Sequence, residues 1–355
     1  MRVASYYSNS DIRLEEKPRP TIGEGELLVR IEASGICGTD CLEWYRINRV
    51  PLVLGHEIAG VVAEVGRGAR LYKVGDRVSV SHHVPCGKCR FCKSGHESVC
   101  DTLRKTNFDP GGFSEFVRVP KINIEKGGVY KLPKNVSFEE ATFIEPLACV
   151  VRGQRLANFS AEGGSADLCG GRKDKSVLVI GSGISGLLHI QLAKLGGAKI
   201  IVATDISEPR LKAARKLGAD YAIDARGYTP KRFKEFNSGY LADFVIICAG
   251  ARQAFEQGLR SVERGGTVLV FAAAGKNMTM PVPINDIFWR NEVTITSSYA
   301  GSPDDHRQAL EKIASHKINV YDMITHRFGL GGTGRGFRLV AKAKESIKVI
   351  IEPQK

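Results

Sequence analysis

The chain has 355 residues, of which 43% are hydrophobic and 25% are charged, a composition that excludes a disordered chain and allows two domains. The sequence contains no run of eighteen apolar residues, so no membrane span is expected. The N-terminal stretch is polar, which favours a cytoplasmic location. The net charge of +13 comes from dispersed lysines and arginines, so we expect a solvated surface with no nucleic-acid or membrane partner. In a cytosolic chain of this size, the spacing of the nine cysteines indicates metal binding.

Residues 1 to about 80 alternate short β-like runs with glycine turns, which predicts a compact, β-rich region. Cys37 and His56 stand beside glycines there, in GICGTD and GHE, and Glu57 follows His56. A thiolate, an imidazole and a carboxylate can together hold zinc. A Cys and a His 19 residues apart are more often unrelated core or surface residues, but the glycines and the next motif favour a zinc site.

A second metal motif follows at CGKCRFCKSGHESVC, with the spacing C-x2-C-x2-C-x7-C. Four thiolates at this spacing form a closed tetrahedral zinc site, which is structural because it leaves no position for a substrate. Disulfides and an iron–sulfur cluster are the alternatives, and the cytosolic setting and the spacing argue against them. The four expected ligands are Cys86, Cys89, Cys92 and Cys100.

Two short helices are expected next. Ser137 and Glu140 form a capping box, and Glu145 and Pro146 open a second helix. The helix dipole there keeps the Glu145 carboxylate ionised, which suits either a metal ligand or an ordinary helix-terminal acid. Residues 157–175 are polar and rich in glycine and are expected to form a linker.

The stretch from 176 to 205 predicts a unit of strand, turn, helix and strand that binds a dinucleotide. Gly181, Gly183 and Gly186 supply G-x-G-x-x-G, and the predicted helix covers residues 184–195. The second strand ends at Asp205, which is placed to accept hydrogen bonds from ribose hydroxyls and to repel the extra phosphate of NADP. NAD is therefore expected, as a preference, because Arg210 could reach a 2′-phosphate.

Strands and helices continue to alternate after Asp205, which predicts a doubly wound parallel sheet. A helix is expected from Ser207 to Leu217, with the Ser207 side chain as its cap. The remaining expected strands cover residues 221–223, 243–248, 267–272 and 293–298, a helix covers 304–315, and a strand at 347–351 returns to the first domain.

The motifs together resemble the zinc-dependent medium-chain dehydrogenase/reductase family, and within it the sorbitol dehydrogenase-like polyol dehydrogenases, over essentially the whole chain. The matching segments are GICGTD, GHE, VGDRV, the four-cysteine segment, IEPL and GSGISG. The resemblance implies an α/β fold: a GroES-like catalytic domain at 1–150 with a zinc lobe at 86–100, a Rossmann domain at 151–297, and a return to the catalytic domain at 298–355. It also implies an active site between the domains and a homodimer or homotetramer.

The resemblance also assigns roles to single residues. Cys37 and His56 would bind a catalytic zinc, with either Glu57 or Glu145 as the acidic ligand. Thr39 would contact the substrate alcohol, Asp40 would orient His56, and Lys348 would lie behind the zinc. Without the family, Thr39 would be read as a turn hydroxyl and Lys348 as an exposed strand lysine. The cofactor contacts would come from Gly181, Gly183, Ile184, Gly186, Asp205 and Arg210.

The implied activity is hydride transfer between NAD and a polyol or other secondary alcohol, with two zinc ions per chain, one catalytic and one structural. Glu145 stands where a cysteine is usual in the alcohol dehydrogenase branch, which favours the polyol branch. A zinc alcohol or amino-alcohol dehydrogenase, such as one acting on threonine, is the alternative. A zinc-ribbon protein that binds nucleic acid would leave the dinucleotide unit unexplained.

Overall fold

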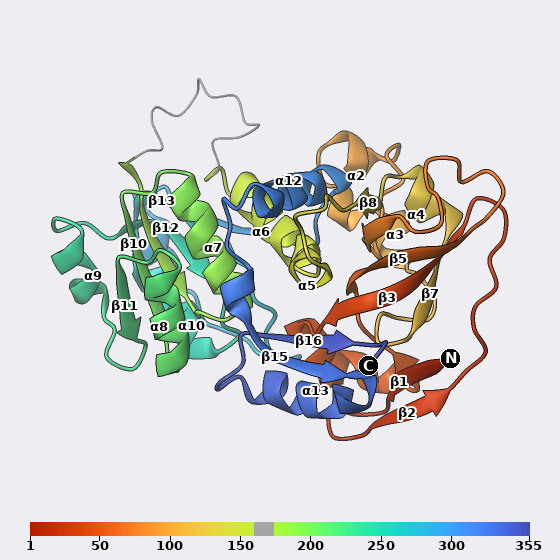
Figure 1. Cartoon of the computed structure of the whole chain (residues 1–355). Helices are drawn as coiled ribbons and strands as arrows, with labels where there is room; N and C mark the ends of the chain where they lie inside the picture. Colours follow the sequence, from red (N-terminus) through yellow and green to blue (C-terminus); the bar gives the residue numbers. More distant parts are fainter. Residues whose placement is uncertain (160–173) are drawn as a thin grey trace. The chain divides into compact units, whose positions relative to one another are not determined.

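The computed structural model describes residues 1–159 and 174–355, so most of the predicted linker lies outside the described residues. The chain divides into two compact units, the first formed by 1–148 and 300–355 and the second by 149–299 (Figure 1). Within the described ranges, no helix is both long and apolar enough to cross a bilayer.

The first unit is built mainly on antiparallel strands, and its last two strands pair in parallel. Its larger sheet has the strand order β15-β16-β3-β5-β6-β8, with β7 also paired to β3, and a smaller sheet has the order β2-β1-β4. Its strands are β1 (Arg2–Tyr6), β2 (Ile12–Glu16), β3 (Leu27–Gly35), β4 (Leu52–Val53), β5 (Glu57–Val65), β6 (Arg77–Val80), β7 (Phe116–Val119), β8 (Val129–Lys131), β15 (Ile324–Gly329) and β16 (Lys348–Glu352).

The helices of this unit are short, apart from two near the C-terminus. They are α1 (Glu43–Arg46), α2 (Arg90–Lys93), α3 (Asp101–Lys105), α4 (Lys121–Glu125), α5 (Phe138–Ala141), α12 (Pro303–Ala314) and α13 (Thr333–Lys342), with 3-10 turns η1 (Gly38–Cys41), η2 (Ile47–Arg49), η3 (Glu97–Val99), η5 (Tyr321–Met323) and η6 (Leu330–Gly332). Ser137 caps α5 in the predicted capping box, and α6 (Ile144–Leu156) begins one residue before Glu145.

Strand register in the large sheet determines which loops meet. In β3 the inward residues Leu27, Val29 and Ile31 are fully buried, as expected for a strand with one face on a core. Gly35 of β3 pairs with Glu57 of β5 and with Ile350 of β16. Residues just beyond the ends of β3, β5 and β16 are therefore brought to the same edge of the sheet. The last strand of the chain, β16, pairs with β3 of this sheet.

The second unit contains a six-stranded parallel sheet in the order β11-β10-β9-β12-β13-β14. The order reverses between β9 and β12, which is the switch point of a doubly wound sheet. Its elements are β9 (Ser176–Ile180), β10 (Ile200–Asp205), β11 (Tyr221–Asp224), β12 (Ala242–Ile247), β13 (Val262–Val270), β14 (Thr294–Ser297), α7 (Ile184–Leu195), α8 (Glu208–Lys216), α9 (Pro230–Phe236), α10 (Arg252–Arg260) and α11 (Ile284–Ile287). All five residues of β9 are buried, as in a strand covered on both faces.

One strand of this sheet starts earlier than the sequence predicts. β13 begins at Val262, whereas its apolar run begins at Thr267. The register with β12 shifts between the pairs Ala242–Val262 and Phe244–Thr267, so residues 263–266 form an irregularity. This part of the strand lacks apolar periodicity, because it contains the polar Glu263 and Arg264 and the following glycines. The sequence pattern therefore does not predict it as a strand.

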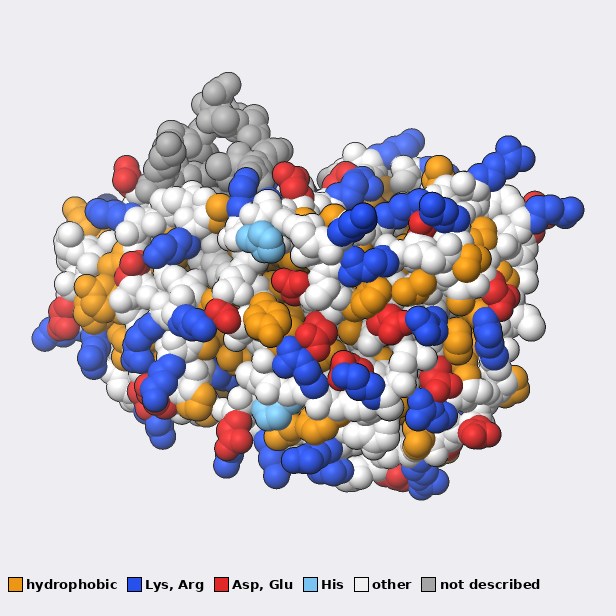
Figure 2. Space-filling model, viewed as in Figure 1, with side chains coloured by type: hydrophobic (Ala, Val, Ile, Leu, Met, Phe, Trp, Pro, Cys, Tyr) orange, Lys and Arg blue, Asp and Glu red, His pale blue; other side chains and the backbone are white. Residues whose placement is uncertain are grey.

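Charge on the surface follows the expectation from composition. On the face shown in Figure 2, lysines and arginines are spread over the surface and acidic side chains lie among them. Several acidic and basic side chains form exposed ion pairs, for example Arg19 with Glu64. This distribution is that of a solvated surface.

Candidate active site and structural metal site

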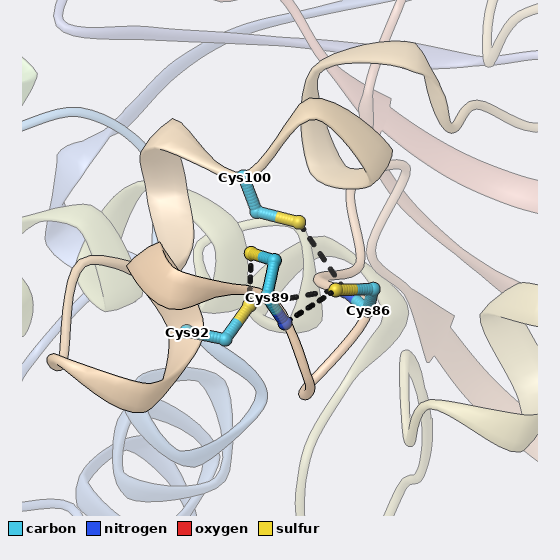
Figure 3. Close-up of side chains that lie close together, drawn as sticks. All are labelled: Cys86, Cys89, Cys92 and Cys100. Atoms are coloured by element: carbon cyan, nitrogen blue, oxygen red, sulfur yellow. Dashed lines mark hydrogen bonds between the residues drawn. The ribbon is translucent and has the colours of Figure 1, made fainter.

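The four cysteines of the 86–100 lobe point their sulfur atoms toward one another (Figure 3). Their Sγ atoms all lie within 4.8 Å of one another. The Sγ of Cys92 is 3.5 Å from that of Cys89 and 3.9 Å from that of Cys86. These separations are far longer than the roughly 2.05 Å of a disulfide bond, so these cysteines are free thiols.

The same distances match a tetrahedral zinc site. Four thiolates at about 2.3 Å from a central zinc are separated by about 3.8 Å from one another. Backbone N–H groups favour the thiolate form of two of these cysteines, whereas burial raises the pKa of the Cys92 thiol to about 12. The N–H groups of Lys88 and Cys89 donate to Cys86 and lower the pKa of its thiol. For Cys100, burial raises the pKa, but backbone N–H donors, first that of Cys86, outweigh it and lower the pKa to about 6. The donor set therefore fits zinc.

A second group of metal-ligating side chains lies at the edge of the large sheet. One ligand atom from each of Cys37, His56 and Glu57 lies within 4.8 Å of the others. Cys37 follows β3 and caps the 3-10 turn η1, His56 precedes β5, and Glu57 is the first residue of β5. Among the described residues, these two groups are the ones close enough to hold an ion. A thiolate, an imidazole and a carboxylate with a fourth position open is the ligand number of a catalytic zinc site.

Asp40 and Thr39 support this group from η1. Asp40 is fully buried, and its Oδ1 is 3.2 Å from His56 Nδ1 while its Oδ2 accepts the Cys37 N–H at 3.1 Å. Burial raises the pKa of Asp40, but His56 and Arg46 outweigh that effect and hold it below its usual value. The Thr39 hydroxyl donates to Cys37 Sγ at 3.2 Å, and its side chain is exposed.

Lys348 is buried rather than exposed. Its ammonium group donates to Oε2 of Glu57, and both side chains are almost completely inaccessible, at 0% and 1%. Glu57 and Lys348 meet directly beside Gly35, where a Cβ would overlap both Glu57 Oε2 and Lys348 Cε. The register of β16 against β3 places Lys348 opposite the end of β3, which explains how a residue near the C-terminus reaches this site.

The structure separates the two glutamates that the sequence left as alternatives. Glu57 belongs to the group with Cys37 and His56. Glu145 lies in the first turn of α6, is half-buried, and is outside that group of described residues at the 4.8 Å limit.

In the second unit, the glycine loop lies between β9 and α7. Gly181 has a φ of +94°, Gly183 is the N-cap of α7, and a Cβ on Gly186 would overlap the carbonyl oxygen of Gly181. A Cβ on Gly183 would meet only the Arg210 guanidinium, 3.7 Å away. The first and third glycines are thus required by backbone geometry, and the second leaves space where backbone N–H groups can approach a phosphate.

Asp205 closes the loop at the end of β10. Its Oδ2 accepts the Ser182 N–H at 2.7 Å and its Oδ1 accepts the Ser207 N–H at 2.9 Å. Ser207 is the N-cap residue of α8, but its side chain does not accept the capping hydrogen bond that the sequence predicted, and its backbone N–H donates to Asp205. The carboxylate is therefore fixed in one orientation beside the glycine loop.

The sequence analysis did not identify three side chains beside His56. The ring of His82 lies with its centroid 4.8 Å from that of His56, and the His83 ring lies 3.7 Å from that of His82, tilted by 34°. Arg46 Nη2 is 3.6 Å from Asp40 Oδ1. The pairing of Ile58 with Val80 places residue 82 opposite residue 56. The nearness of His82 to His56 therefore follows from the β5–β6 register.

Comparison with known proteins agrees with this geometry. The profile of the alcohol dehydrogenase GroES-like domain matches residues 23–134, and that of the zinc-binding dehydrogenases matches residues 185–315. The chain is 31% identical to a sorbitol dehydrogenase of Halalkalibacterium halodurans, covering 99% of this chain and 98% of that protein. It is 34% identical to an L-threonine 3-dehydrogenase of Pyrococcus furiosus, covering 93% and 92%. The structure of a zinc-binding dehydrogenase from Sinorhizobium meliloti bound to NADP superposes with a TM-score of 0.84 at 26% identity, covering 99% of both chains.

The chain belongs to the zinc-containing medium-chain dehydrogenase/reductase family. It is a zinc-dependent oxidoreductase acting on an alcohol or polyol with a nicotinamide cofactor. The predicted α/β architecture, with a GroES-like domain and a Rossmann sheet, is confirmed.

Proposed function

We propose that the protein oxidises a polyol or similar secondary alcohol with NAD, at a site formed by Cys37, His56 and Glu57. The observation that carries the proposal is the convergence of these three ligand types at one sheet edge in a dehydrogenase chain. Sorbitol dehydrogenases recur among the relatives at about 30% identity over nearly the full length, which supports a polyol.

Each residue of the site has a proposed role. Cys37, His56 and Glu57 would hold the catalytic zinc, which supplies Lewis-acid polarisation of the substrate hydroxyl when bound. Asp40 would fix the His56 ring, because it faces Nδ1 and leaves Nε2 for the metal. Lys348 would balance the negative charge of the Glu57 carboxylate. Glu145 would not be a zinc ligand.

Thr39 is proposed to contact the substrate hydroxyl and to start its proton on the way to solvent. Thr39 is exposed, and its hydroxyl lies 3.2 Å from Sγ of Cys37, one of the three proposed ligands. A hydroxyl both donates and accepts hydrogen bonds, so it can take the substrate proton while passing its own to water.

The substrate class is tested by a spectrophotometric screen of polyols, sugars, sugar phosphates and amino alcohols with NAD. We expect the highest kcat/KM with a polyol or one of its derivatives. An amino alcohol such as threonine is the second candidate, because the threonine 3-dehydrogenase relative has an identity as high as those of the sorbitol dehydrogenases. A kcat/KM for threonine above that for every polyol would replace the polyol proposal.

NAD is proposed as the cofactor because the Asp205 carboxylate is fixed beside the glycine loop and would repel a 2′-phosphate. Arg210 lies against Gly183, so some use of NADP is expected. Asp205→Ser should lower kcat/KM with NAD and raise it with NADP, while Asp224→Ser, at the half-exposed last residue of the next strand, should change neither kcat/KM. A wild-type kcat/KM higher with NADP than with NAD would contradict the proposal.

We also propose a homodimer or homotetramer joined at β14. Among the described residues, this strand is the last in its sheet and pairs only with β13, which leaves its other edge without a partner strand there. Large apolar side chains are exposed on or near it, with Ile295 at 39%, Trp289 at 68% and Tyr299 at 51%. Such an edge pairs readily with a second chain. Light scattering at micromolar concentration should give a multiple of the chain mass, and a monomer would exclude this arrangement.

A further inference from the structure

We propose that Arg46, assisted by Arg49, forms an anion-binding subsite beside the catalytic group, and that the preferred substrate is a polyol carrying a phosphate or carboxylate group. This inference rests on the proposed function and narrows its substrate class. It starts from the position of Arg46, which is separated from His56 only by the Asp40 carboxylate: Nη2 of Arg46 and Nδ1 of His56 lie 3.6 Å and 3.2 Å from Asp40 Oδ1.

The protein does not use all the hydrogen-bond donors of the Arg46 guanidinium. Its side chain is only 16% exposed, yet 3.6 Å to Asp40 is longer than a hydrogen bond. Its Nε is buried and has no hydrogen-bond partner among the described residues. Asp40 meanwhile accepts from the Cys37 N–H and faces His56. A guanidinium has five donors in a planar fork, and a partly buried one with unused donors is suited to an incoming anion.

A second cation lies against the same aromatic ring as Arg46. The guanidinium carbons of Arg46 and Arg49 lie 4.8 Å and 5.0 Å from the centroid of the same Tyr45 ring. Glu43 is the one acidic residue between 41 and 50, and the ion pairs of the described residues include none between it and either arginine. Of these two cations only Arg46 faces an acid among the described residues, the Asp40 carboxylate, so the pair keeps positive charge that favours the approach of an anion.

The side chains around the Cys37–His56 group suit a hydroxylated chain. The His82 ring lies with its centroid 4.8 Å from that of His56, and the His83 ring lies 3.7 Å from that of His82. Imidazole nitrogens can donate or accept hydrogen bonds with hydroxyl groups. Trp44 and Tyr45, each about two-fifths exposed, add aromatic surface on the same turn as Arg46. The anionic end of the substrate would meet Arg46 while a carbinol lies at the Cys37–His56 group.

The test compares three six-carbon probes of matched length: sorbitol, sorbitol 6-phosphate and gluconate. For the wild-type enzyme with NAD, we expect kcat/KM for at least one anionic probe to exceed that for sorbitol at least tenfold. The anionic probe with the higher kcat/KM shows whether the subsite prefers a phosphate or a carboxylate. Arg46→Gln should reduce the ratio of anionic to neutral kcat/KM at least tenfold, and Arg46→Lys, which keeps the charge without the fork, should reduce it less.

Arg70→Gln is the control, because Arg70 is an exposed arginine of the same unit and the substitution removes the same charge. It should leave the ratio at the wild-type value. A general loss of structure lowers both activities and leaves the ratio unchanged, so the ratio isolates anion recognition. A second readout is thermal: with NAD saturating the dinucleotide site, inorganic phosphate should raise the Tm of the wild type, and this rise should be lost in Arg46→Gln.

The outcomes separate this inference from the function it rests on. If sorbitol is oxidised at least as efficiently as both anionic probes, or if Arg46→Gln leaves the ratio unchanged, the anion subsite is wrong while the polyol dehydrogenase stands. If no alcohol of any charge is oxidised, the proposed function fails. Phosphate stabilisation that persists in Arg46→Gln would also overturn the subsite.

Discussion

The two candidate metal sites of this chain are built in opposite ways. The four cysteines come from one short segment, residues 86–100, and nearby backbone N–H groups already favour the thiolates of Cys86 and Cys100. Cys37, His56 and Glu57 come from the ends of two strands and are supported by Lys348 from a third, at the far end of the sequence. The first site depends on local chain geometry and the second on the register of a whole sheet.

This difference implies a division of labour. A full set of four protein ligands leaves no place for a substrate, so the energy of metal binding goes into folding the lobe. Three ligands with an open position can support chemistry, and the surrounding sheet is stable through its own core. Each of the following substitutions tests whether stability and catalysis separate in this way.

The largest expected effect is on catalysis. Cys37→Ala should lower kcat by roughly 10³-fold to 10⁴-fold, since a Lewis-acid metal contributes several kcal/mol to the barrier. It should remove about one zinc per chain and leave the Tm and NAD binding nearly unchanged. Metal analysis, thermal melting and steady-state kinetics on one preparation give the comparison. Near wild-type kcat with that zinc gone would contradict a zinc-dependent mechanism at this site.

The opposite result is expected at the lobe. Cys92→Ala removes one of four thiolates and should lower the Tm by roughly 10 °C or more, because metal binding and local folding are one free energy there. The kcat per folded molecule should fall far less than in Cys37→Ala. Cys41→Ala is a matched control, as Cys41 is a half-buried thiol outside both groups. A Cys92→Ala protein with unchanged Tm would show that the lobe does not need its metal.

The contrast between local and distant ligands also explains how much the sequence could predict. The cysteine spacing and the glycine loop are local patterns, and the structure places each of them as expected. The nearness of His82 to His56 depends on the β5–β6 register, and the nearness of Arg46 to Asp40 depends on how η1 and α1 turn. Neither register nor turn direction can be read from apolar periodicity, so these side chains were missed.

Lys348 illustrates the same limit. As an isolated strand residue it would be expected on the surface, and only the family resemblance indicated otherwise. Its burial follows from the pairing of β16 with β3, a contact between residues more than 300 positions apart. The Glu57–Lys348 pair therefore links the last strand of the chain to the candidate ligand set.

Removing one partner of this pair should produce the next largest effect. Lys348→Met leaves the Glu57 carboxylate buried without its cation, which should destabilise the metal-free protein by about 3–5 kcal/mol. Bound zinc would supply a replacement positive charge, so the loss should be smaller in the zinc-loaded protein. Denaturant unfolding with and without zinc measures the difference. Adding Glu57→Gln to Lys348→Met should recover part of the stability of the metal-free protein, and full additivity of the two losses would mean that the pair is not coupled.

The smallest expected effect tests the support of the site without touching its ligands. Asp40→Asn keeps the shape of the side chain and removes the charge that faces His56 Nδ1. Substitution of such a partner of a ligating histidine commonly lowers metal affinity or activity by about 10–100-fold. The Asp40→Asn substitution should leave the lobe zinc in place, because Asp40 does not belong to the four-cysteine group of residues 86–100. A chelator titration followed by metal analysis should therefore release one zinc at lower chelator concentration than in the wild type and the other at the same concentration. If both ions left together in the variant, the two sites would be coupled through the fold, and the separation into a catalytic and a structural site would have to be abandoned.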